Sequence, residues 1–176
     1  MGRNNKQIIS RLLIAIAMLT INISSPQSAL ASRLAYGEIA SIQQQEEAIG
    51  QILYSSRHKL RDNQGNTWQV VLFKRVKNNQ TQEIDLRLVG FPQMFQFVHP
   101  GNLIIVIDDQ QVFSASDRFT EKSPSPNVGE FDTQEIISSL LLDRSVKLVL
   151  PLTAENPVEI VLPSPVILEW QELAKS

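Results

Sequence analysis

The chain has 176 residues, of which 43% are hydrophobic, and its 16 basic and 18 acidic side chains give a formal net charge of −2. This length is typical of one domain, and it can bury a core without covalent cross-links. The lack of cysteine excludes disulfides and thiolate metal sites. The slightly acidic balance argues against nucleic acid and anionic membrane surfaces as partners, since both favour clustered Lys and Arg.

The first 31 residues are typical of a cleaved secretory signal peptide. Arg3, Lys6 and Arg11 precede an apolar run at 12–23, which is short for a transmembrane helix because spanning a bilayer takes roughly 20 apolar residues. Small residues then follow, and we expect signal peptidase to cleave at the site formed by Ala29, Ala31 and Ser32. An uncleaved signal anchor is the alternative. The favoured prediction is an exported chain with no stable membrane insertion after cleavage.

Residues 32–50 carry a Gln/Glu cluster and few apolar side chains. We expect a polar arm or linker here, with a short helix as the alternative. From residue 51 onward the hydrophobic pattern changes to a period of two, which is typical of strands. The sequence therefore predicts one β-rich globular domain over 51–176.

Three strands are expected, at 51–60, 67–76 and 83–90. The first and third alternate between apolar and polar residues, whereas 67–76 is apolar on both faces, which predicts a central, well-covered strand. Short loops of turn-forming residues join these strands, which predicts an antiparallel meander. Two more hairpins are expected. The first is formed by 102–107 and 112–116 around a turn at Asp108-Asp109, and the second by 145–152 and 157–163.

Two helices are expected in the second half of the chain. Asp132 provides a candidate N-cap for the first, whose apolar stripe would be Ile136, Ile137, Leu140 and Leu141. Ser164 as cap and Pro165 at the first helical position would begin the second. The fold class is therefore α+β, a single domain with about seven antiparallel strands, arranged as a meander plus hairpins, and two short covering helices.

Candidate catalytic residues are few. His58 and His99 are each more typical of a structural histidine than of a general base, and no serine has the setting of a nucleophile elbow. The acidic candidates occur in the pairs Asp108-Asp109, Asp117 with Glu121, and Glu130 with Asp132, but none has the ligand spacing of a calcium loop. We expect no catalytic residue, no cofactor and no metal. Trp68 and Trp170 are expected to fill the core rather than line a pocket.

One long irregular segment is the candidate interaction loop. Its two prolines favour an extended backbone and remove hydrogen-bond donors, and long loops in small domains are often functional. The candidate residues are Ser123, Pro124, Ser125, Pro126, Asn127, Val128, Gly129, Glu130 and Phe131.

Three stretches, "LRDNQGNTWQVVLFKR", "LRLVGFP" and "EIVLPSPVILEWQELA", together with the leader and "SPSPNVGEFD", carry a family resemblance. The chain resembles a family of secreted cyanobacterial proteins known as a domain of unknown function (number three-one-two-two), over nearly all of 34–175. The resemblance implies a cyanobacterial source and export to the periplasm or thylakoid lumen. It implies no activity and no site residues.

Three hypotheses follow for function. The first is a non-catalytic accessory or binding protein that docks on a protein partner, such as a photosynthetic or other membrane complex, from the lumenal or periplasmic side. The second is a carrier of a small apolar ligand, a lipid or a pigment. The third is a hydrolase that uses the scattered carboxylates, and the lack of a catalytic constellation places it last.

Overall fold

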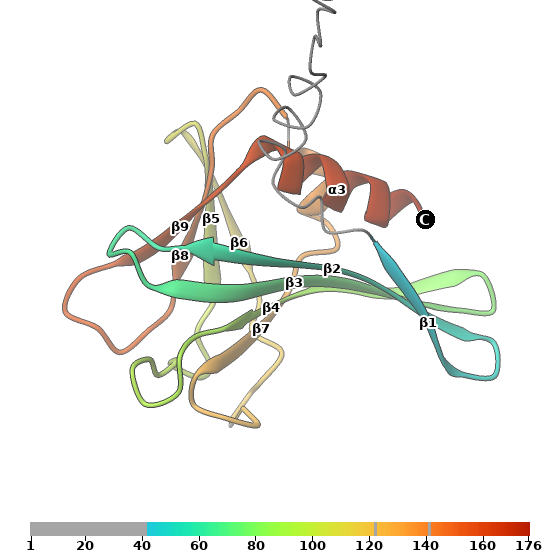
Figure 1. The fold of residues 1–176 in the computed structure, drawn as a ribbon, viewed down its shortest axis with the longest axis horizontal. Coiled ribbons are helices and arrows are strands. Elements are labelled where there is room, and N and C mark those ends of the chain that lie inside the picture. Colours follow the sequence, from blue (N-terminus) through green and yellow to red (C-terminus); the bar gives the residue numbers. More distant parts are fainter. Residues whose placement is uncertain (1–41, 122, 141) are drawn as a thin grey trace, which may run out of the picture. The chain divides into compact units, whose positions relative to one another are not determined.

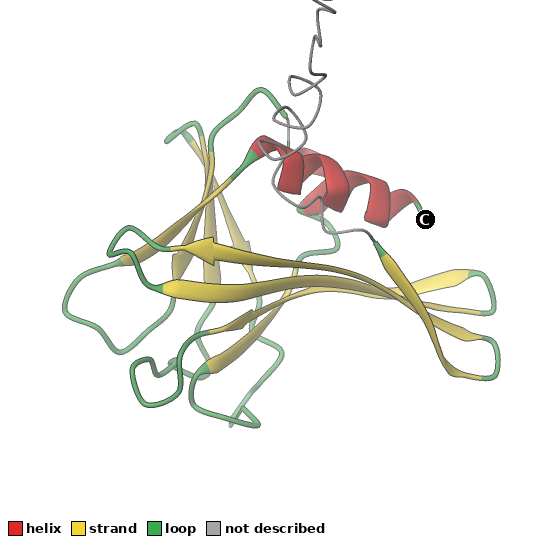
Figure 2. Cartoon of the chain, in the orientation of Figure 1, coloured by secondary structure: helices red, strands yellow, loops and turns green. Residues whose placement is uncertain are grey.

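The fold is described from a computed structural model, which describes residues 42–121, 123–140 and 142–176. All of these residues belong to one compact unit, Ile39–Ser176. In this part of the chain the structure contains nine strands, arranged in two antiparallel sheets, and one α-helix (Figures 1 and 2). The predicted single β-rich domain is confirmed at this level.

The first sheet has the strand order β1-β2-β3-β4-β7, with β1 (Gln43–Ala48), β2 (Gln51–Arg61), β3 (Thr67–Lys77), β4 (Gln80–Val89) and β7 (Val128–Asp132). The second has the order β6-β5-β8-β9, with β5 (Leu103–Ile107), β6 (Gln111–Ala115), β8 (Val146–Leu150) and β9 (Val158–Leu162). A 3₁₀ turn, η1 (Ile137–Ser139), precedes β8, and helix α3 (Ser164–Lys175) follows β9.

The predicted meander and both predicted hairpins are confirmed. Strands β2, β3 and β4 pair in sequence, β5 pairs with β6, and β8 pairs with β9. Because side chains alternate between the two faces of a strand, the even-numbered apolar residues of β4 are buried, while Arg87 between them is exposed. The Asp108-Asp109 turn is also confirmed, since both residues have positive φ, 50° and 54°, as a tight hairpin turn requires.

Backbone bridges connect the two sheets at both edges. Asp62, directly after β2, bridges to Ile160 of β9, and Asp117, shortly after β6, bridges to Phe131 of β7. The two sheets therefore enclose one common hydrophobic core. Trp68, Phe131 and Trp170 are its largest fully buried side chains, so the two tryptophans fill the core as the sequence predicts.

Helix α3 packs against β2, β3 and η1. Its buried positions Val166, Ile167, Trp170 and Leu173 form one apolar stripe that faces the core. Its start differs by one residue, because the helix begins at Ser164 and the cap position is Pro163, with no side-chain capping bond. The carbonyl oxygen of Pro163 accepts the first backbone bond, from the amide of Val166 at 2.9 Å.

The prediction of about seven strands is wrong, because the described residues form nine. The first additional strand, β1, lies in the segment expected to be a polar arm or a short helix, and it pairs with β2. The second, β7, occupies the end of the expected interaction loop and pairs with β4. Both are short, and β1 is exposed at every position, so it lacks the apolar alternation that marks a strand.

The prediction of two helices is also wrong. The expected helix after Asp132 is reduced to the short turn η1, and Leu140 already has an extended conformation, with φ −72° and ψ 127°. Two β-branched isoleucines followed by two serines have weak helix propensity. In addition, both the amide and the hydroxyl of Thr133 donate to the carbonyl of Ile84, which ties this segment to β4.

Candidate functional site

A surface pocket of about 490 Å³ lies between two loops at the end of β4 and the start of β7. Residues 92–96, 125–127 and 153 line it, and we call it the loop pocket. It is of the size that small-molecule and side-chain binding sites usually have. It includes the Ser-Pro-Asn part of the predicted interaction loop, so the structure places those residues beside a second loop that the sequence did not single out.

Reciprocal hydrogen bonds hold the two loops of the pocket together. The amide of Gly90 donates to the carbonyl of Asn127 at 3.0 Å, and the side-chain amide of Asn127 donates back to the carbonyl of Gly90 at 2.8 Å. The amide of Phe97 donates to the carbonyl of Pro126 at 2.9 Å. Polar groups that are satisfied in this way hold a loop in one arrangement. The pocket is therefore part of the folded framework.

Aromatic packing supports the loop pocket from below. The rings of Trp68 and Phe95 lie 4.5 Å apart between centroids. A Cβ atom at Gly90 would lie 2.7 Å from both rings, closer than real contacts allow. Glycine is therefore required at this position, because any side chain would displace the aromatic pair on which the loop rests.

Two large apolar side chains beside the loop pocket are exposed to solvent. Phe91 is 66% exposed and Met94 is 61% exposed, and Pro126 on the opposite loop is also exposed. An exposed aromatic and a methionine that adjoin a formed pocket are typical of interaction surfaces, where such side chains contribute much of the binding energy. Phe91 and Met94 are not among the residues predicted from the sequence. The available signal was an aromatic residue between Gly90 and Pro92, in a turn where no core position is expected.

The structure divides the predicted interaction loop in two. Its first part, Ser123 to Asn127, is irregular and contributes to the loop pocket. Its second part, from Val128 onward, belongs to β7, where Phe131 is fully buried and Glu130 is 9% exposed. The carboxylate of Glu130 pairs with Arg87 at 2.6 Å.

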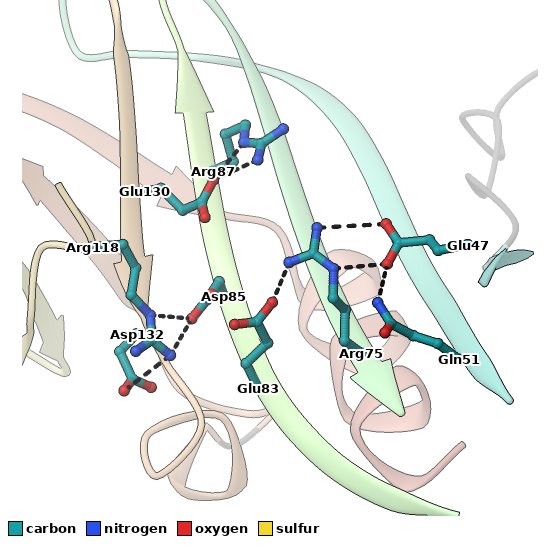
Figure 3. Close-up of polar contacts among 9 residues, drawn as sticks. All are labelled: Glu47, Gln51, Arg75, Glu83, Asp85, Arg87, Arg118, Glu130 and Asp132. Atoms are coloured by element: carbon teal, nitrogen blue, oxygen red, sulfur yellow. Dashed lines mark hydrogen bonds and ion pairs between the residues drawn. The ribbon is translucent and has the colours of Figure 1, made fainter. Parts of the chain in front are cut away.

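The outward face of the first sheet carries a network of ion pairs (Figure 3). Arg75 on β3 lies between Glu47 and Glu83, and it contacts Glu47 at 2.9 Å. Arg118 contacts both Asp85, at 2.8 Å, and Asp132, at 3.2 Å. The pairs connect β3 with β1 and β4, and β4 with β7 directly or through Arg118, so they cross-link the strands of the sheet.

Asp85 is the unusual member of this network, because its side chain is only 1% exposed. Burial raises its pKa to about 6, although the neighbouring Arg118 acts in the opposite direction. Carboxyls of this kind occur at catalytic sites and in structural ion-pair networks alike. Here the partner Arg118 also holds the partly exposed Asp132, which fits the structural role.

The two histidines make structural contacts. His58 contacts the hydroxyl of Ser56 at 3.0 Å and the carboxylate of Glu169 at 3.5 Å, and both contacts involve Nε2. A serine-based relay needs the serine and the acid on different ring nitrogens, so this arrangement lacks the geometry of a catalytic triad. His99 Nδ1 lies 2.6 Å from Asp117.

Two of the remaining acidic candidates, Asp108 and Asp117, are explained by their local contacts. Asp108 pairs with Arg144 at 3.2 Å and accepts the amide of Ser145 at 2.9 Å, so it connects the β5–β6 turn to the segment that precedes β8. The carboxylate of Asp117 accepts the amides of Gly101, at 3.1 Å, and Phe119, at 2.9 Å. Within the described ranges, no three His, Asp or Glu side chains lie close enough together to hold a metal ion.

The predicted signal peptide and its cleavage site at Ala29, Ala31 and Ser32 lie outside the described residues. In the part of the chain that the structure describes, no helix is both long and apolar enough to cross a membrane.

Comparison with known proteins gives one match. A family model described as "Protein of unknown function (DUF3122)" matches residues 40–173. No curated protein and no solved structure matches the chain. The family match begins before β1 and ends within α3, so it spans both sheets and the loop pocket.

Proposed function

The chain belongs to the DUF3122 family of proteins of unknown function, and we propose that it is an exported, non-catalytic binding protein that docks on a protein partner through the loop pocket. The proposal includes a cyanobacterial source and export to the periplasm or thylakoid lumen, with a membrane complex as the partner. The basic leader, the apolar run at 12–23 and the small residues up to Ala31 support export.

The observation that carries the proposal is the pair of exposed side chains, Phe91 and Met94, next to a pocket whose walls are hydrogen-bonded to each other. Binding to a rigid surface loses little conformational entropy, because the loops are already ordered. A partner side chain that enters the pocket would bury both residues around it, as the core of a protein interface requires.

A non-catalytic role is favoured because the polar side chains that could take part in catalysis make structural contacts within the fold. His58 and His99 are largely buried and contact Glu169 and Asp117 within the fold. The Asp108-Asp109 pair forms a hairpin turn. None of these groups lies on the loop pocket, which is lined by proline, amide, methionine and phenylalanine side chains together with Ser125 and Thr153.

Photo-crosslinking on native membranes tests the docking surface. A photoreactive amino acid placed at Met94 should crosslink one protein partner when the tagged chain is incubated with membranes of its own organism. The same amino acid at Val112, which is 65% exposed on β6, is the matched control and should give no such product. Replacing Phe91 and Met94 together by serine should lower recovery of that partner about tenfold, because two anchoring contacts are lost.

The serine variant should keep the melting temperature of the parent chain, since both side chains are largely exposed. Equal crosslinking from positions 94 and 112, or unchanged recovery with the serine variant, would refute docking through the loop pocket. Native mass spectrometry of the protein from its source gives a further check. A bound small apolar molecule that a Met94→Trp substitution displaces would assign the pocket to a ligand carrier instead.

A further inference from the structure

Three basic side chains form a row on the outward face of β2. Arg57, Lys59 and Arg61 are all exposed and occupy alternate positions of one strand, so they point to the same side of the sheet. Successive members of such a row are roughly 7 Å apart along the strand. We call these three residues the basic row.

The basic row is not neutralised within the described part of the chain. None of its three side chains lies within the 4.0 Å of a carboxylate that defines an ion pair there, whereas Arg75, Arg87 and Arg118 on or beside the same sheet are all paired (Figure 3). Three like charges on one strand repel each other, and no ion pair within the described structure offsets this repulsion. On a chain of net negative charge, this local excess of positive charge favours a negatively charged partner surface.

The strand register places the basic row close to the loop pocket. Lys59 is paired with Gln69 on β3, and Gln69 is paired with Val89 on β4. Two strand spacings separate Lys59 from Val89, which is about 10 Å, and Phe91 follows Val89 by two residues. Figure 1 shows the ends of β2 and β4 at the same end of the sheet. The floor of the pocket, Trp68, lies on the core face of β3, opposite to the row. A partner that follows the row to the end of the sheet could reach round this end to the pocket.

We infer that the basic row and the loop pocket together bind an acidic, extended segment of the partner protein. In this segment carboxylates occur at every second residue, and a neighbouring large apolar side chain enters the pocket. The inference rests on the proposed docking function and specifies the chemistry of its partner. An extended peptide places alternate side chains at the same roughly 7 Å spacing as the row, so each carboxylate meets one cation.

A protein segment fits this surface better than a phosphate-bearing polymer or an anionic bilayer. The same outward face carries five carboxylates that share only three arginines, which leaves an excess of negative charge beside the row; they are Glu47, Glu83, Asp85, Glu130 and Asp132. These would repel a uniformly anionic surface, whereas a peptide of one strand's width can follow the row and avoid them.

A synthetic peptide provides the first test. Its sequence has three glutamates alternating with threonines, followed by a phenylalanine, and the control peptide has the same composition with the glutamates adjacent. Fluorescence anisotropy should show tighter binding of the alternating peptide at about 0.15 M salt, and most of this binding should be lost at about 1 M salt, where charges are screened beyond roughly 3 Å. Replacing the basic row by three glutamines should weaken binding about tenfold.

The matched control replaces Lys77, Arg144 and Lys175 by glutamine, which removes the same charge from positions away from the row. This variant should bind the alternating peptide within about twofold of the parent chain. Equal binding of both peptides, or equal weakening by both variants, would overturn the inference. Binding to vesicles of anionic phospholipid, or to inorganic phosphate, that depends on the row and exceeds peptide binding would overturn it too.

Recovery of the native partner separates this inference from the proposed function. If both are right, the basic-row variant and the Phe91/Met94 serine variant each lose the partner. If only the proposed function is right, the serine variant loses the partner and the basic-row variant retains it in full. If neither variant changes recovery, both proposals fail.

Discussion

Asp62 shows how one carboxylate determines the turn between β2 and β3. Its two oxygens accept hydrogen bonds from the amides of Gln64, at 2.9 Å, and Asn66, at 2.8 Å, and from the indole of Trp68, at 3.0 Å. Burial alone would raise the pKa of Asp62, but these donors outweigh it and hold the pKa below the ordinary value. The residue therefore connects the turn to the central tryptophan of the core, and through Trp68 to the floor of the loop pocket.

The pKa of Asp85 is shifted upward, opposite to that of Asp62, and this shift predicts how the stability of the protein depends on pH. Its pKa of about 6 in the folded chain lies above its ordinary value of 3.8. The stability that this carboxyl contributes is therefore fully present below about pH 4 and is lost as the pH rises through about 6. We expect the free energy of unfolding of the parent chain, measured relative to Asp85→Asn, to fall by about 3 kcal/mol between about pH 3 and about pH 8.

Urea denaturation at a series of pH values measures this difference. Asp109→Asn is the matched control, since the side chain of Asp109 is 86% exposed, and its difference from the parent should change little over the same range. A difference between parent and Asp85→Asn that stays constant, or that grows with pH, would contradict a buried carboxyl whose charged form is disfavoured.

At the scale of elements, helix α3 is attached to the first sheet by buried charged residues. Lys74 of β3, 4% exposed, donates to the carbonyls of Ala174, at 2.8 Å, and Ser176, at 2.5 Å. A cation at this position complements the negative end of the helix dipole. Glu169 in the same helix is 7% exposed, and within the described structure neither of its carboxylate oxygens has a hydrogen-bond partner.

Replacing Glu169 by glutamine should stabilise the protein at neutral pH. A buried carboxylate without hydrogen bonds loses the favourable free energy of its hydration. The 3.5 Å contact with His58 compensates for only part of this free energy. We expect the free energy of unfolding to rise by about 1–3 kcal/mol. Chemical denaturation measures it, with Glu172→Gln as control on the exposed side of the same helix. A destabilised Glu169→Gln variant would show instead that the pair with His58 is a net source of stability.

The elements that the sequence predicts correctly are those with a strong hydrophobic period. Strands β3 and β4 and helix α3 each bury a regular set of apolar residues, and this pattern is visible without any tertiary information. Strand β1 has the sequence QQQEEA with every residue exposed, so only its pairing with β2 makes it a strand. Strand β7 follows two prolines, and its burial comes from pairing with β4.

The candidate site was predictable only in part for the same reason. The prolines and the length of the segment around Pro126 marked one wall of the loop pocket. The other wall depends on Asn127 bonding to Gly90, which lies far from it in the sequence. Arg57 and Lys59 of the basic row lie on one face of the strand predicted at 51–60, but Arg61 lies just beyond that predicted strand and joins the row only in β2 as observed. Whether acidic neighbours neutralise the row depends on the register with β3 and β4.

At the scale of the whole domain, the bridges at both edges of the sheets predict that the two sheets unfold together. Phe131 lies at one of these edges, where it bridges to Asp117, is fully buried, and has its ring 6.0 Å from that of Phe97. Replacing Phe131 by alanine should lower the free energy of unfolding by about 3–5 kcal/mol, because it leaves a cavity in the shared core.

Amide hydrogen exchange distinguishes global from local unfolding in this variant. If the sheets form one cooperative unit, the slowest amides of β3 and of β8 should lose the same amount of protection, although Phe131 itself lies on the first sheet. Val112→Ala, on the exposed side of β6, should leave both sets unchanged. Loss of protection in one sheet alone would mean that the edge bridges do not couple the sheets. The loop pocket is built on the first sheet and also includes Thr153, which lies three residues after the end of β8. Cooperative unfolding would therefore keep its walls together as long as the domain is folded.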